Sequence, residues 1–387
     1  MTEENISKRI LELSESSIRE MHNLCEEYNG INLSQGSPDF PMHKRIKDAA
    51  IKAMQEGHNQ YTSTWGIQEL LDNIAIKLKE FNKIKADSKN EITVTCGSSE
   101  AVASSIISLV EKDDEVIIME PFYENYLPDT IISQGKPRYI ELKPMKFTIN
   151  EEELKSIFNS KTKVIIINTP NNPTGKIFSE NELKIIADLC EDFNVTAITD
   201  EIYEYITYDN NKHVSLASIG NMFNRTVTIS GFSKTYNMTG WRIGYAVAEK
   251  KLTENIRKVH EFLTVCPPSP LQYGALEGLK LPKIYYELLS RTYQSKKNLF
   301  LKMLIDIGFK CFEPQGSCFI WAEYSKLSKL NGVEFAKYLI KEIGVAGVPG
   351  SSFYSDNKSD KKWIRFSFPK SDKMLTEAGK RLLKLKQ

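Results

Sequence analysis

Apolar and polar residues alternate in a regular way between about residues 91 and 247 of this 387-residue chain. Short runs rich in isoleucine, valine and threonine are separated by longer stretches, such as 179–193, in which apolar residues recur at helical spacing. Strand and helix patterns that take turns along a chain are typical of an α/β layer structure with a mostly parallel central sheet. The runs expected to be strands are residues 91–95, 115–119, 164–168, 196–199 and 226–230.

The C-terminal part of the chain predicts a second, smaller domain. Residues 261–306 have a largely helical pattern, interrupted by prolines at 267–270 and at 282. Beyond them, residues 309–321, 344–349 and 363–368 have the pattern of strands with helices between them. A chain of 387 residues is long enough for two domains and a large core.

Composition and charge exclude several classes of protein. Hydrophobic residues make up 41% and charged residues 26% of the chain, which is ordinary for a globular protein. Lys and Arg number 51 against 50 for Asp and Glu, so no overall charge draws the chain to nucleic acid or to an anionic membrane. The start lacks the apolar core of a signal peptide, and no apolar run has the length of a membrane span. Six scattered cysteines without a Cys-x-x-Cys pair are typical of reduced thiols, so we expect a cytoplasmic protein.

Lys234 is the residue with the clearest chemical setting. It follows the predicted strand 226–230 and lies among small, hydroxylated and aromatic residues in the segment 230–245. An amine that is partly buried there loses its charge more easily and becomes a nucleophile able to form a Schiff base with an aldehyde. Taken alone, Lys234 is as well explained by an exposed lysine in a polar turn.

Polar motifs also follow several other predicted strands. They are Cys96-Gly-Ser-Ser99, Asn171-Asn-Pro173 and Asp200, in addition to Lys234. In open α/β sheets, ligands bind beyond the C-terminal ends of the strands. The four motifs are therefore expected to meet in one crevice.

The segment Ser233-Lys-Thr-Tyr-Asn-Met-Thr-Gly-Trp-Arg-Ile-Gly244 resembles the cofactor-lysine motif of the class I/II pyridoxal-phosphate aminotransferases, which have fold type I. Five further segments resemble motifs of this family in the same order along the chain. They are Asn32-Leu-Ser-Gln-Gly-Ser-Pro-Asp-Phe-Pro41, Cys96-Gly-Ser-Ser-Glu-Ala101, Asn168-Thr-Pro-Asn-Asn-Pro-Thr-Gly175, Thr199-Asp-Glu-Ile-Tyr203 and Trp363-Ile-Arg-Phe-Ser367. The resemblance covers most of the chain and is to the I-gamma subgroup of aspartate, aromatic and kynurenine-type enzymes. It implies a large cofactor-binding domain at 42–285 and a small α/β domain formed by 1–41 and 286–387.

The resemblance implies pyridoxal 5'-phosphate as the cofactor, which needs a covalent handle, an acid partner for its ring nitrogen and an anion site for its phosphate. Lys234 is the implied Schiff-base lysine and proton carrier, and Asp200 the implied partner of the ring nitrogen. Tyr203 and Asn172 are the implied hydrogen-bond partners of the ring oxygen. Considered apart from the resemblance, Asp200 could be a helix N-cap and Asn172 a turn residue. No metal is expected.

The phosphate site is expected where the strand 91–95 runs into an apolar helix. Free backbone N–H groups and the positive end of the helix dipole lie at Gly97, Ser98 and Ser99 in that arrangement. The alternative is an ordinary helix start with Ser98 or Ser99 as N-cap. Arg242 is expected to add a fixed cation to the phosphate. Its alternative role is a surface ion pair.

Two aromatic residues complete the implied cofactor site. Tyr123 matches the position whose ring stacks on the cofactor, with Phe122 as the neighbouring alternative and core packing as the alternative for both. Tyr61 resembles the tyrosine that reaches the phosphate of the neighbouring subunit. The resemblance therefore implies a homodimer with shared active sites.

Substrate recognition is expected at Arg365, a cation inside the apolar run 363–368. In the family this arginine binds the substrate α-carboxylate, and Asn172 lies beside the substrate. Gly36 matches the position where a missing side chain lets the substrate approach the backbone, although it is equally an ordinary loop glycine.

Two positions depart from the family pattern. Many members have a serine three residues before the lysine as a phosphate ligand, whereas this chain has Gly231, so Ser230 or Ser233 becomes the candidate replacement. At the position of Ser99, some aspartate-specific relatives have a lysine and some aromatic-preferring ones a tyrosine. Ser99 is neither, which argues against strict aspartate specificity.

The predicted function is transfer of an amino group from an L-amino acid to a 2-oxo acid by a ping-pong mechanism, with glutamate and 2-oxoglutarate as one pair. A β-lyase or an aminocyclopropane-carboxylate-synthase-like lyase on the same site is the enzymatic alternative. The alternative of another class is a non-catalytic aminotransferase-like ligand-binding protein. A nicotinamide dehydrogenase is poorly supported, because no Gly-x-Gly-x-x-Gly opens a helix after a strand.

Overall fold

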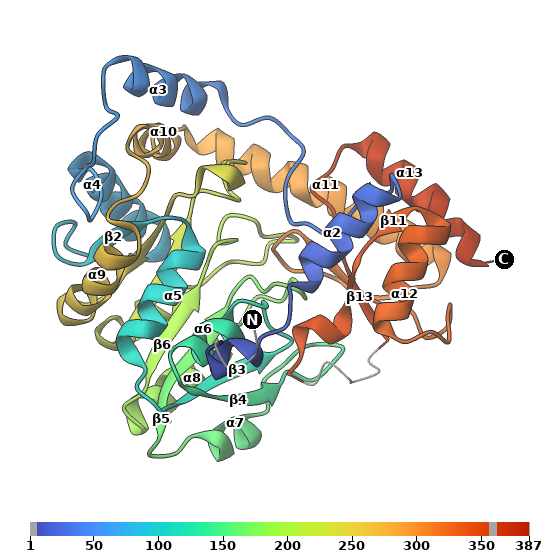
Figure 1. Ribbon diagram of the computed structural model, residues 1–387, viewed down its shortest axis with the longest axis horizontal. Helices are drawn as coiled ribbons and strands as arrows, with labels where there is room; N and C mark the ends of the chain where they lie inside the picture. Colours follow the sequence, from blue (N-terminus) through green and yellow to red (C-terminus); the bar gives the residue numbers. More distant parts are fainter. Residues whose placement is uncertain (1–5, 356–361, 387) are drawn as a thin grey trace.

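The computed structural model describes residues 6–355 and 362–386. Within them, a seven-stranded sheet with the order β2-β8-β7-β6-β5-β3-β4 forms the centre of the larger layer structure (Figure 1). The strands are β2 (Ile92–Thr95), β3 (Glu115–Glu120), β4 (Lys136–Glu141), β5 (Thr162–Asn168), β6 (Thr196–Asp200), β7 (Thr226–Gly231) and β8 (Gly244–Val247). The strands from β7 to β4 pair in parallel, and only β8 runs antiparallel to its neighbours β2 and β7. The predicted mostly parallel sheet is confirmed.

Helices cover both faces of this sheet, because side chains of a strand alternate between its faces. In β3, Ile117 and Met119 pack in one core, together with α7 and α8. Val116 and Ile118 pack in another, together with α5, α6 and α9. These helices are α5 (Ser98–Leu109), α6 (Tyr126–Ile132), α7 (Glu151–Ile157), α8 (Glu180–Asp192) and α9 (Lys250–Thr264). The helix predicted at 179–193 is α8, which begins with a capping box between Ser179 and Glu182.

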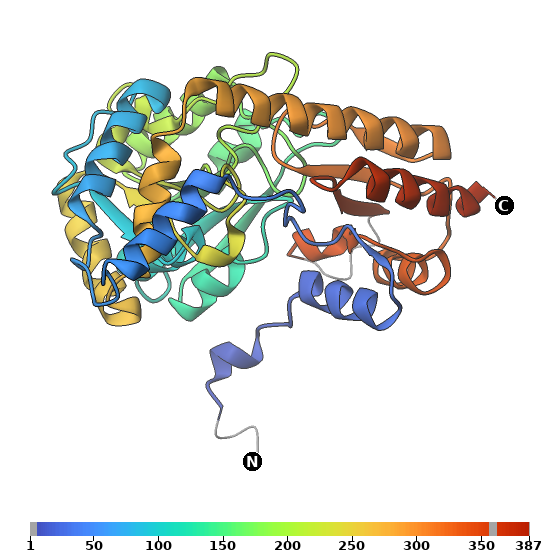
Figure 2. The same ribbon diagram turned by 90° about the horizontal axis from the view of Figure 1, so that it is seen from above.

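A third group of helices surrounds the β2 end of the sheet. It comprises α3 (Lys44–Gln55), α4 (Gln68–Lys77) and α10 (Ser269–Leu279). The long helix α11 (Lys283–Ile307) then runs from this part of the molecule along the second sheet (Figure 2). The predicted interruptions by proline are found at the two ends of α10, which begins after Pro268 and is followed by Pro282. The expected domain division at 285/286 falls in the first turn of α11 and stays a prediction.

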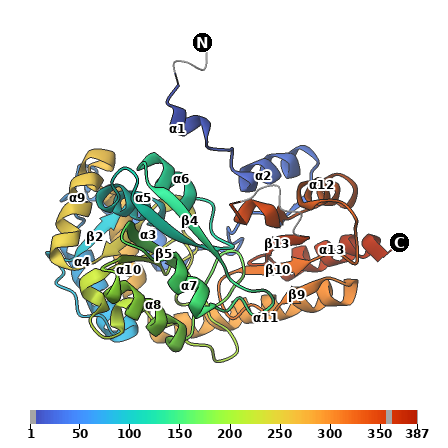
Figure 3. The same cartoon turned by 90° about the horizontal axis from the view of Figure 1, so that it is seen from below.

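The second sheet has the order β12-β13-β10-β9 and is antiparallel, while β1 and β11 form a separate parallel pair. The N-terminal helix α2 lies against this part of the molecule, and Met21 and Cys25 share a core with Phe335 and Leu375 (Figure 3). The elements are α1 (Lys8–Leu11), α2 (Ser17–Glu27), β1 (Ile31–Asn32), β9 (Lys310–Phe312), β10 (Phe319–Glu323), α12 (Gly332–Tyr338), β11 (Val345–Ala346), β12 (Val348–Pro349), β13 (Trp363–Ser367) and α13 (Asp372–Leu382).

The predicted strand at 309–321 is wrong in its middle, where β9 and β10 are separate. Pro314 offers no backbone donor, and the N–H groups of Gln315 and Gly316 both donate to the carbonyl of Gly175 instead of to a neighbouring strand. Short 3-10 and π-helical turns complete the chain. They are η2 (Leu78–Asn82), η3 (Leu216–Ser218), η4 (Met222–Arg225), η5 (Thr239–Trp241), η6 (Leu339–Ile343), η7 (Gly350–Phe353) and η8 (Leu383–Lys386).

Two further observations concern the whole of the described chain. All six cysteines are free, with Cys25, Cys190 and Cys318 buried and the others partly exposed. Among the described residues, no helix combines the length and the apolar character that crossing a membrane requires.

Candidate active site

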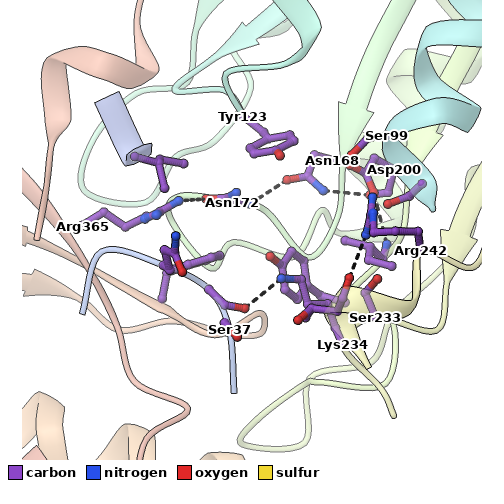
Figure 4. Close-up of a pocket in the computed structure, with 18 residues that line it drawn as sticks. Ser37, Ser99, Tyr123, Asn168, Asn172, Asp200, Ser233, Lys234, Arg242 and Arg365 are labelled. Atoms are coloured by element: carbon purple, nitrogen blue, oxygen red, sulfur yellow. Dashed lines mark hydrogen bonds between the residues drawn. The ribbon is translucent and has the colours of Figure 1, made fainter. Parts of the chain in front are cut away.

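A pocket of about 380 Å³ lies at the C-terminal ends of the central strands, next to β10 and β13 of the second sheet (Figure 4). It brings together nearly all of the residues that the sequence singled out. They are Gly36, Ser98, Ser99, Tyr123, Asn172, Asp200, Tyr203, Lys234, Arg242 and Arg365. The exception is Tyr61, which is 81% exposed and lies outside this pocket. The expected meeting of the strand-end motifs in one crevice is therefore confirmed.

The Lys234 amine points into the pocket and is partly buried. Its Nζ donates a hydrogen bond of 2.8 Å to the carbonyl of Gly36 and lies 5.8 Å from the centre of the Tyr203 ring. Burial lowers the pKa of Lys234, and the charges of Arg365 and Arg242 lower it further. Cys318 and, to a smaller extent, Asp200 act in the opposite direction without cancelling the shift. The amine thus loses its proton more readily than an exposed lysine.

Asp200 ends strand β6 and is 5% exposed. Its Oδ2 accepts a hydrogen bond of 2.8 Å from the Tyr126 hydroxyl, and its Oδ1 accepts one of 3.3 Å from the Ile202 amide. Burial raises the pKa of Asp200, although both hydrogen bonds oppose that rise. The N-cap alternative for Asp200 is wrong, because no helix follows it directly. A buried carboxylate held only by neutral donors is suited to receive a cationic partner.

The turn after β2 has the geometry of an anion site. Gly97, at φ +82°, precedes α5, and no side chain caps this helix start, so the alternative that Ser98 or Ser99 is the N-cap is wrong. Arg242 packs over Gly97 so closely that a Cβ there would lie 2.4 Å from its Nη2. The Arg242 Nη1 also donates a hydrogen bond of 3.0 Å to the Thr239 carbonyl. Free amides, a helix dipole and a guanidinium therefore converge on one spot.

Steric crowding explains the glycine at position 231, where many family members have serine. A Cβ on Gly231 would lie 3.0 Å from the Gly244 Cα and 3.1 Å from the Ile243 carbonyl oxygen. Of the two candidate replacements, Ser230 donates a hydrogen bond of 2.6 Å to Glu204 and does not line the pocket, whereas Ser233 does. Ser233 is therefore the hydroxyl placed to take over the missing contact.

Arg365 is 1% exposed and projects from β13 between two rings, 4.2 Å from the centre of Phe319 and 4.9 Å from that of Phe353. Its Nη1 donates a hydrogen bond of 2.8 Å to the Asn172 Oδ1, and its Nη2 donates to the Ser34 carbonyl. Burial lowers the pKa of Arg365. Each terminal nitrogen carries two hydrogens, so one N–H on each is left for a ligand.

Of the aromatic candidates, Tyr123 and Tyr203 line the pocket, whereas Phe122 does not. Tyr123 lines the pocket, and burial raises its pKa to about 12, so it is neutral at physiological pH. Phe122 is 3% exposed and packs in the core against Tyr139, with ring centres 5.9 Å apart, so the alternative of Phe122 in the site is wrong. Tyr203 meets Phe319 edge to face at 5.9 Å.

Sequence reasoning missed several residues of the pocket. These are Ile18, Gln35, Ser37, Asn168, Ile202, Thr239 and Phe319 as lining residues, and Tyr126 as the partner of Asp200. Asn168 could have been predicted from its position at the end of a strand. It ends β5 next to Asp200, whose carbonyl accepts its side-chain N–H at 2.9 Å. Ile18 could not have been predicted from the sequence, because its position depends on how α2 lies against the body of the molecule.

Comparison with known proteins decides the family. The family model described as aminotransferase class I and II matches residues 28–382. The chain belongs to this family. An aromatic-amino-acid aminotransferase of Thermococcus litoralis and an aspartate aminotransferase of Pyrococcus abyssi are each 34% identical to it over 384 residues, covering 98% of both chains. The solved structure of YbdL from Escherichia coli, a methionine aminotransferase, superposes with a TM-score of 0.94 at 31% identity and covers 98% of this chain and 99% of that one.

The class I/II aminotransferases use pyridoxal phosphate, and the pocket of this enzyme fits it. It offers an amine with a lowered pKa, a buried carboxylate held by neutral donors and an uncapped helix start beside a guanidinium. These match the aldehyde, the ring nitrogen and the phosphate of the cofactor, respectively. The relatives named above act on different amino acids, so family membership leaves the substrate open.

Proposed function

We propose that this aminotransferase moves the amino group of an L-amino acid with a neutral side chain to a 2-oxo acid. Glutamate and 2-oxoglutarate, which carry a second carboxylate, stay a prediction from the family as one pair. The proposal rests on the observation that Lys234, Asp200 and Arg365 line the same pocket. The relatives support transamination over the two lyase alternatives and over a non-catalytic binding protein. A cytoplasmic location and a ping-pong order stay predictions from the sequence and the family.

The division of positive charge in the pocket supports a neutral substrate side chain. Among the described residues that line it, the cations are Lys234, Arg242 and Arg365. Lys234 is assigned to the cofactor aldehyde, Arg242 to the phosphate and Arg365 to the substrate α-carboxylate. No lysine or arginine of the described lining is then left for a second carboxylate, whereas Ile18, Tyr123 and Phe319 offer apolar surface.

In the proposed mechanism, bound pyridoxal phosphate supplies an electron sink for the bond broken at the substrate α-carbon. Arg365 holds the α-carboxylate with the remaining N–H group on each of its two terminal nitrogens, and Asn172 and Ser34 fix the orientation of the guanidinium. Lys234, freed by the substrate amine, moves the proton at the α-carbon, for which its lowered pKa suits it. Asp200 would hold the ring nitrogen of the cofactor and keep it charged, and Tyr203 and Asn172 would hold its ring oxygen.

Homodimerisation with shared active sites is part of the proposal. Tyr61 is 81% exposed and Phe262 is 90% exposed, and Leu263 and Val265 are also exposed apolar residues. Such large exposed side chains are typical of surfaces that another chain covers. A solution mass equal to that of one chain, 44.2 kDa, would contradict the dimer.

The side-chain preference is testable with a panel of amino donors. Phenylalanine, tyrosine and methionine are expected to give a kcat/KM at least about tenfold above that of aspartate, since a buried unpaired carboxylate costs about 1.4 kcal/mol or more. 2-Oxoglutarate, pyruvate and phenylpyruvate serve as acceptors, and stoichiometric consumption of the acceptor separates transamination from elimination. A preference for aspartate would show that a further cation reaches the substrate.

Arg365→Ala is expected to lower kcat/KM for amino acids and for oxo acids alike by roughly tenfold to a hundredfold, because a charge-assisted pair contributes about 1.5–3 kcal/mol. The cofactor spectrum is expected to stay unchanged. Arg365→Lys should restore only part of the loss, since an ammonium offers a point charge instead of a fork. The control substrate is an amine without an α-carboxylate. An equal loss with that amine would mean that Arg365 supports the fold rather than the substrate.

A further inference from the structure

The phosphate turn is tied to the rest of the molecule by a buried pair of residues that the reaction itself does not use. Glu100 is the third residue of α5, directly behind Ser98 and Ser99. Its Oε2 accepts a hydrogen bond of 3.0 Å from the Cys96 amide, and its Oε1 accepts one from the Ser104 hydroxyl. The Glu100 carboxylate thus ties the backbone at Cys96, before the turn that is assigned to the cofactor phosphate, to the Ser104 side chain in α5.

His260 completes this arrangement from α9. Its side chain is fully buried, with Nδ1 3.1 Å from each oxygen of Glu100 and Nε2 2.8 Å from the carbonyl oxygen of Thr64. A carbonyl accepts hydrogen bonds and a carboxylate accepts them too, so the imidazolium form of His260 satisfies both contacts by donating from each ring nitrogen. In that form His260 bridges the phosphate turn and the loop at 60–66, which carries Tyr61.

The groups that face His260 support its charged form. Burial lowers its pKa and the charge of Arg257 lowers it further, but the hydrogen bond to Glu100, the charge of Glu100 and the Thr64 carbonyl outweigh them, so the pKa of His260 is raised. Arg257 lies one turn earlier on α9 and stacks on Trp65 at 4.8 Å. The Thr264 hydroxyl lies 3.2 Å from His260 Nδ1.

The neighbouring Cys96 thiol adds no charge beside Glu100 and His260. Burial is the main cause that raises the pKa of Cys96, and the charge of Glu100 and the nearby Cys266 raise it further. Cys96 is thus an uncharged thiol at neutral pH. Glu100 and His260 therefore form the pair that decides the charge behind the turn.

We propose that His260, paired with Glu100, is a positioning residue that sets the affinity of the enzyme for the phosphate group of its cofactor. A carboxylate in the first turn of α5 repels a phosphate at the same helix start, and the imidazolium of His260 cancels that repulsion. The same contacts hold the Cys96 amide and the loop at 60–66 in place. The inference rests on the proposed assignment of Ser98, Ser99 and Arg242 to the phosphate.

The test measures cofactor affinity by equilibrium dialysis of the holoenzyme against pyridoxal phosphate and, separately, against pyridoxal, which lacks the phosphate. His260→Gln is expected to weaken pyridoxal phosphate about tenfold or more and to leave pyridoxal nearly unchanged. The double variant Glu100→Gln with His260→Gln is expected to regain most of the loss, because the uncompensated charge is gone. Lys258→Gln, which removes an exposed positive charge from the same helix, is the matched control and should behave as wild type.

The pH dependence of the wild type provides a second measurement that does not depend on a folded variant. His260 has a raised pKa, so the imidazolium persists to higher pH than in a free histidine and is lost as the pH rises through that pKa. The preference for pyridoxal phosphate over pyridoxal should fall over this range, which lies above the ordinary histidine pKa and above the second pKa of the phosphate, about 6. His260→Gln should lack this fall.

The outcomes separate the inference from the proposed function. A wild-type enzyme that binds pyridoxal phosphate no better than pyridoxal would contradict the phosphate site itself. A clear preference in the wild type that persists in His260→Gln and stays flat with pH would overturn the role of His260 alone. A double variant as weak as the single one would show that the pair acts through packing and not through charge, which also overturns the inference.

Discussion

Lys234→Ala is expected to reduce transamination by at least about 10⁴-fold, because the variant loses both the covalent handle for the cofactor and the group that moves the proton. The absorbance band of the covalently bound cofactor should also be absent in Lys234→Ala. In the wild type, borohydride should attach the pyridoxyl group permanently to Lys234, which peptide mass spectrometry would detect. Lys250→Ala, which changes an exposed lysine at the start of α9, is the matched control and should keep band and turnover.

Two outcomes would contradict the assignment of Lys234. One is a pyridoxyl group found on another lysine after reduction. The other is a Lys234→Ala variant that keeps measurable turnover without added amine. Partial rescue of the variant by a small amine such as methylamine is expected, since the pocket of about 380 Å³ leaves room for it and the rescued function is that of a free amine. A variant that had merely lost its fold would show no rescue.

The fold was predictable from the sequence where strands are buried on both faces. β3 and β5 are continuous apolar runs, because Ile117 and Met119 face α7 and α8 while Val116 and Ile118 face α5 and α9. The edge strand β4 was not predicted, since its exposed and buried residues mix with proline and charged residues. The division of 309–321 into β9 and β10 depends on bonds to Gly175, far away in sequence, which no local pattern contains.

The site residues that lie at or near the C-terminal ends of strands were predictable from the sequence. Asp200 ends the buried strand β6, and Asn172 and Lys234 lie a few residues beyond the ends of β5 and β7, so their meeting follows from the parallel sheet. Tyr126 and Ile18 were missed for different reasons. Tyr126 reaches Asp200 across the first turn of α6, and Ile18 reaches the pocket only because α2 packs against the second sheet. Both depend on tertiary packing that sequence spacing does not encode.

A buried polar network supports the segment that carries Asp200 and Tyr203. Lys77 lies 2.5 Å from the Glu204 carboxylate, and the Asn82 side chain donates to Glu204 at 2.8 Å and to Glu201 at 3.3 Å. The charge of Lys77 overcomes the effect of burial, so the pKa of Glu204 is lowered. Glu201, Glu204 and His213 are close enough to hold a metal ion, but Lys77 already pairs with Glu204, and Glu201 contacts His213 at 2.7 Å. The network therefore anchors Glu201 and Glu204, the residues that directly follow Asp200 and Tyr203.

Asp200→Asn is expected to lower kcat by about 10²- to 10³-fold, the size of effect seen when one electrostatic contact to a developing charge is removed. The amide can still accept hydrogen bonds from Tyr126 or Ile202, so the variant should fold and bind the cofactor. It cannot, however, balance a positive charge on the ring nitrogen. The loss should fall on kcat more than on KM, because the contact matters most in the transition state.

Tyr126→Phe is the matched control for Asp200→Asn, because it removes a hydrogen bond from the carboxylate and leaves its charge. The bond from Tyr126 lowers the pKa of Asp200, so its loss should raise that pKa further. The active enzyme needs the ionised carboxylate, which exists only above the pKa, so the acidic limb of the kcat/KM profile should move to higher pH in Tyr126→Phe. Asp200→Asn should have no such limb at all. Near-normal kcat in Asp200→Asn, or an acidic limb that persists unchanged in both variants, would remove Asp200 from this role, and the partner of the ring nitrogen would have to be another group.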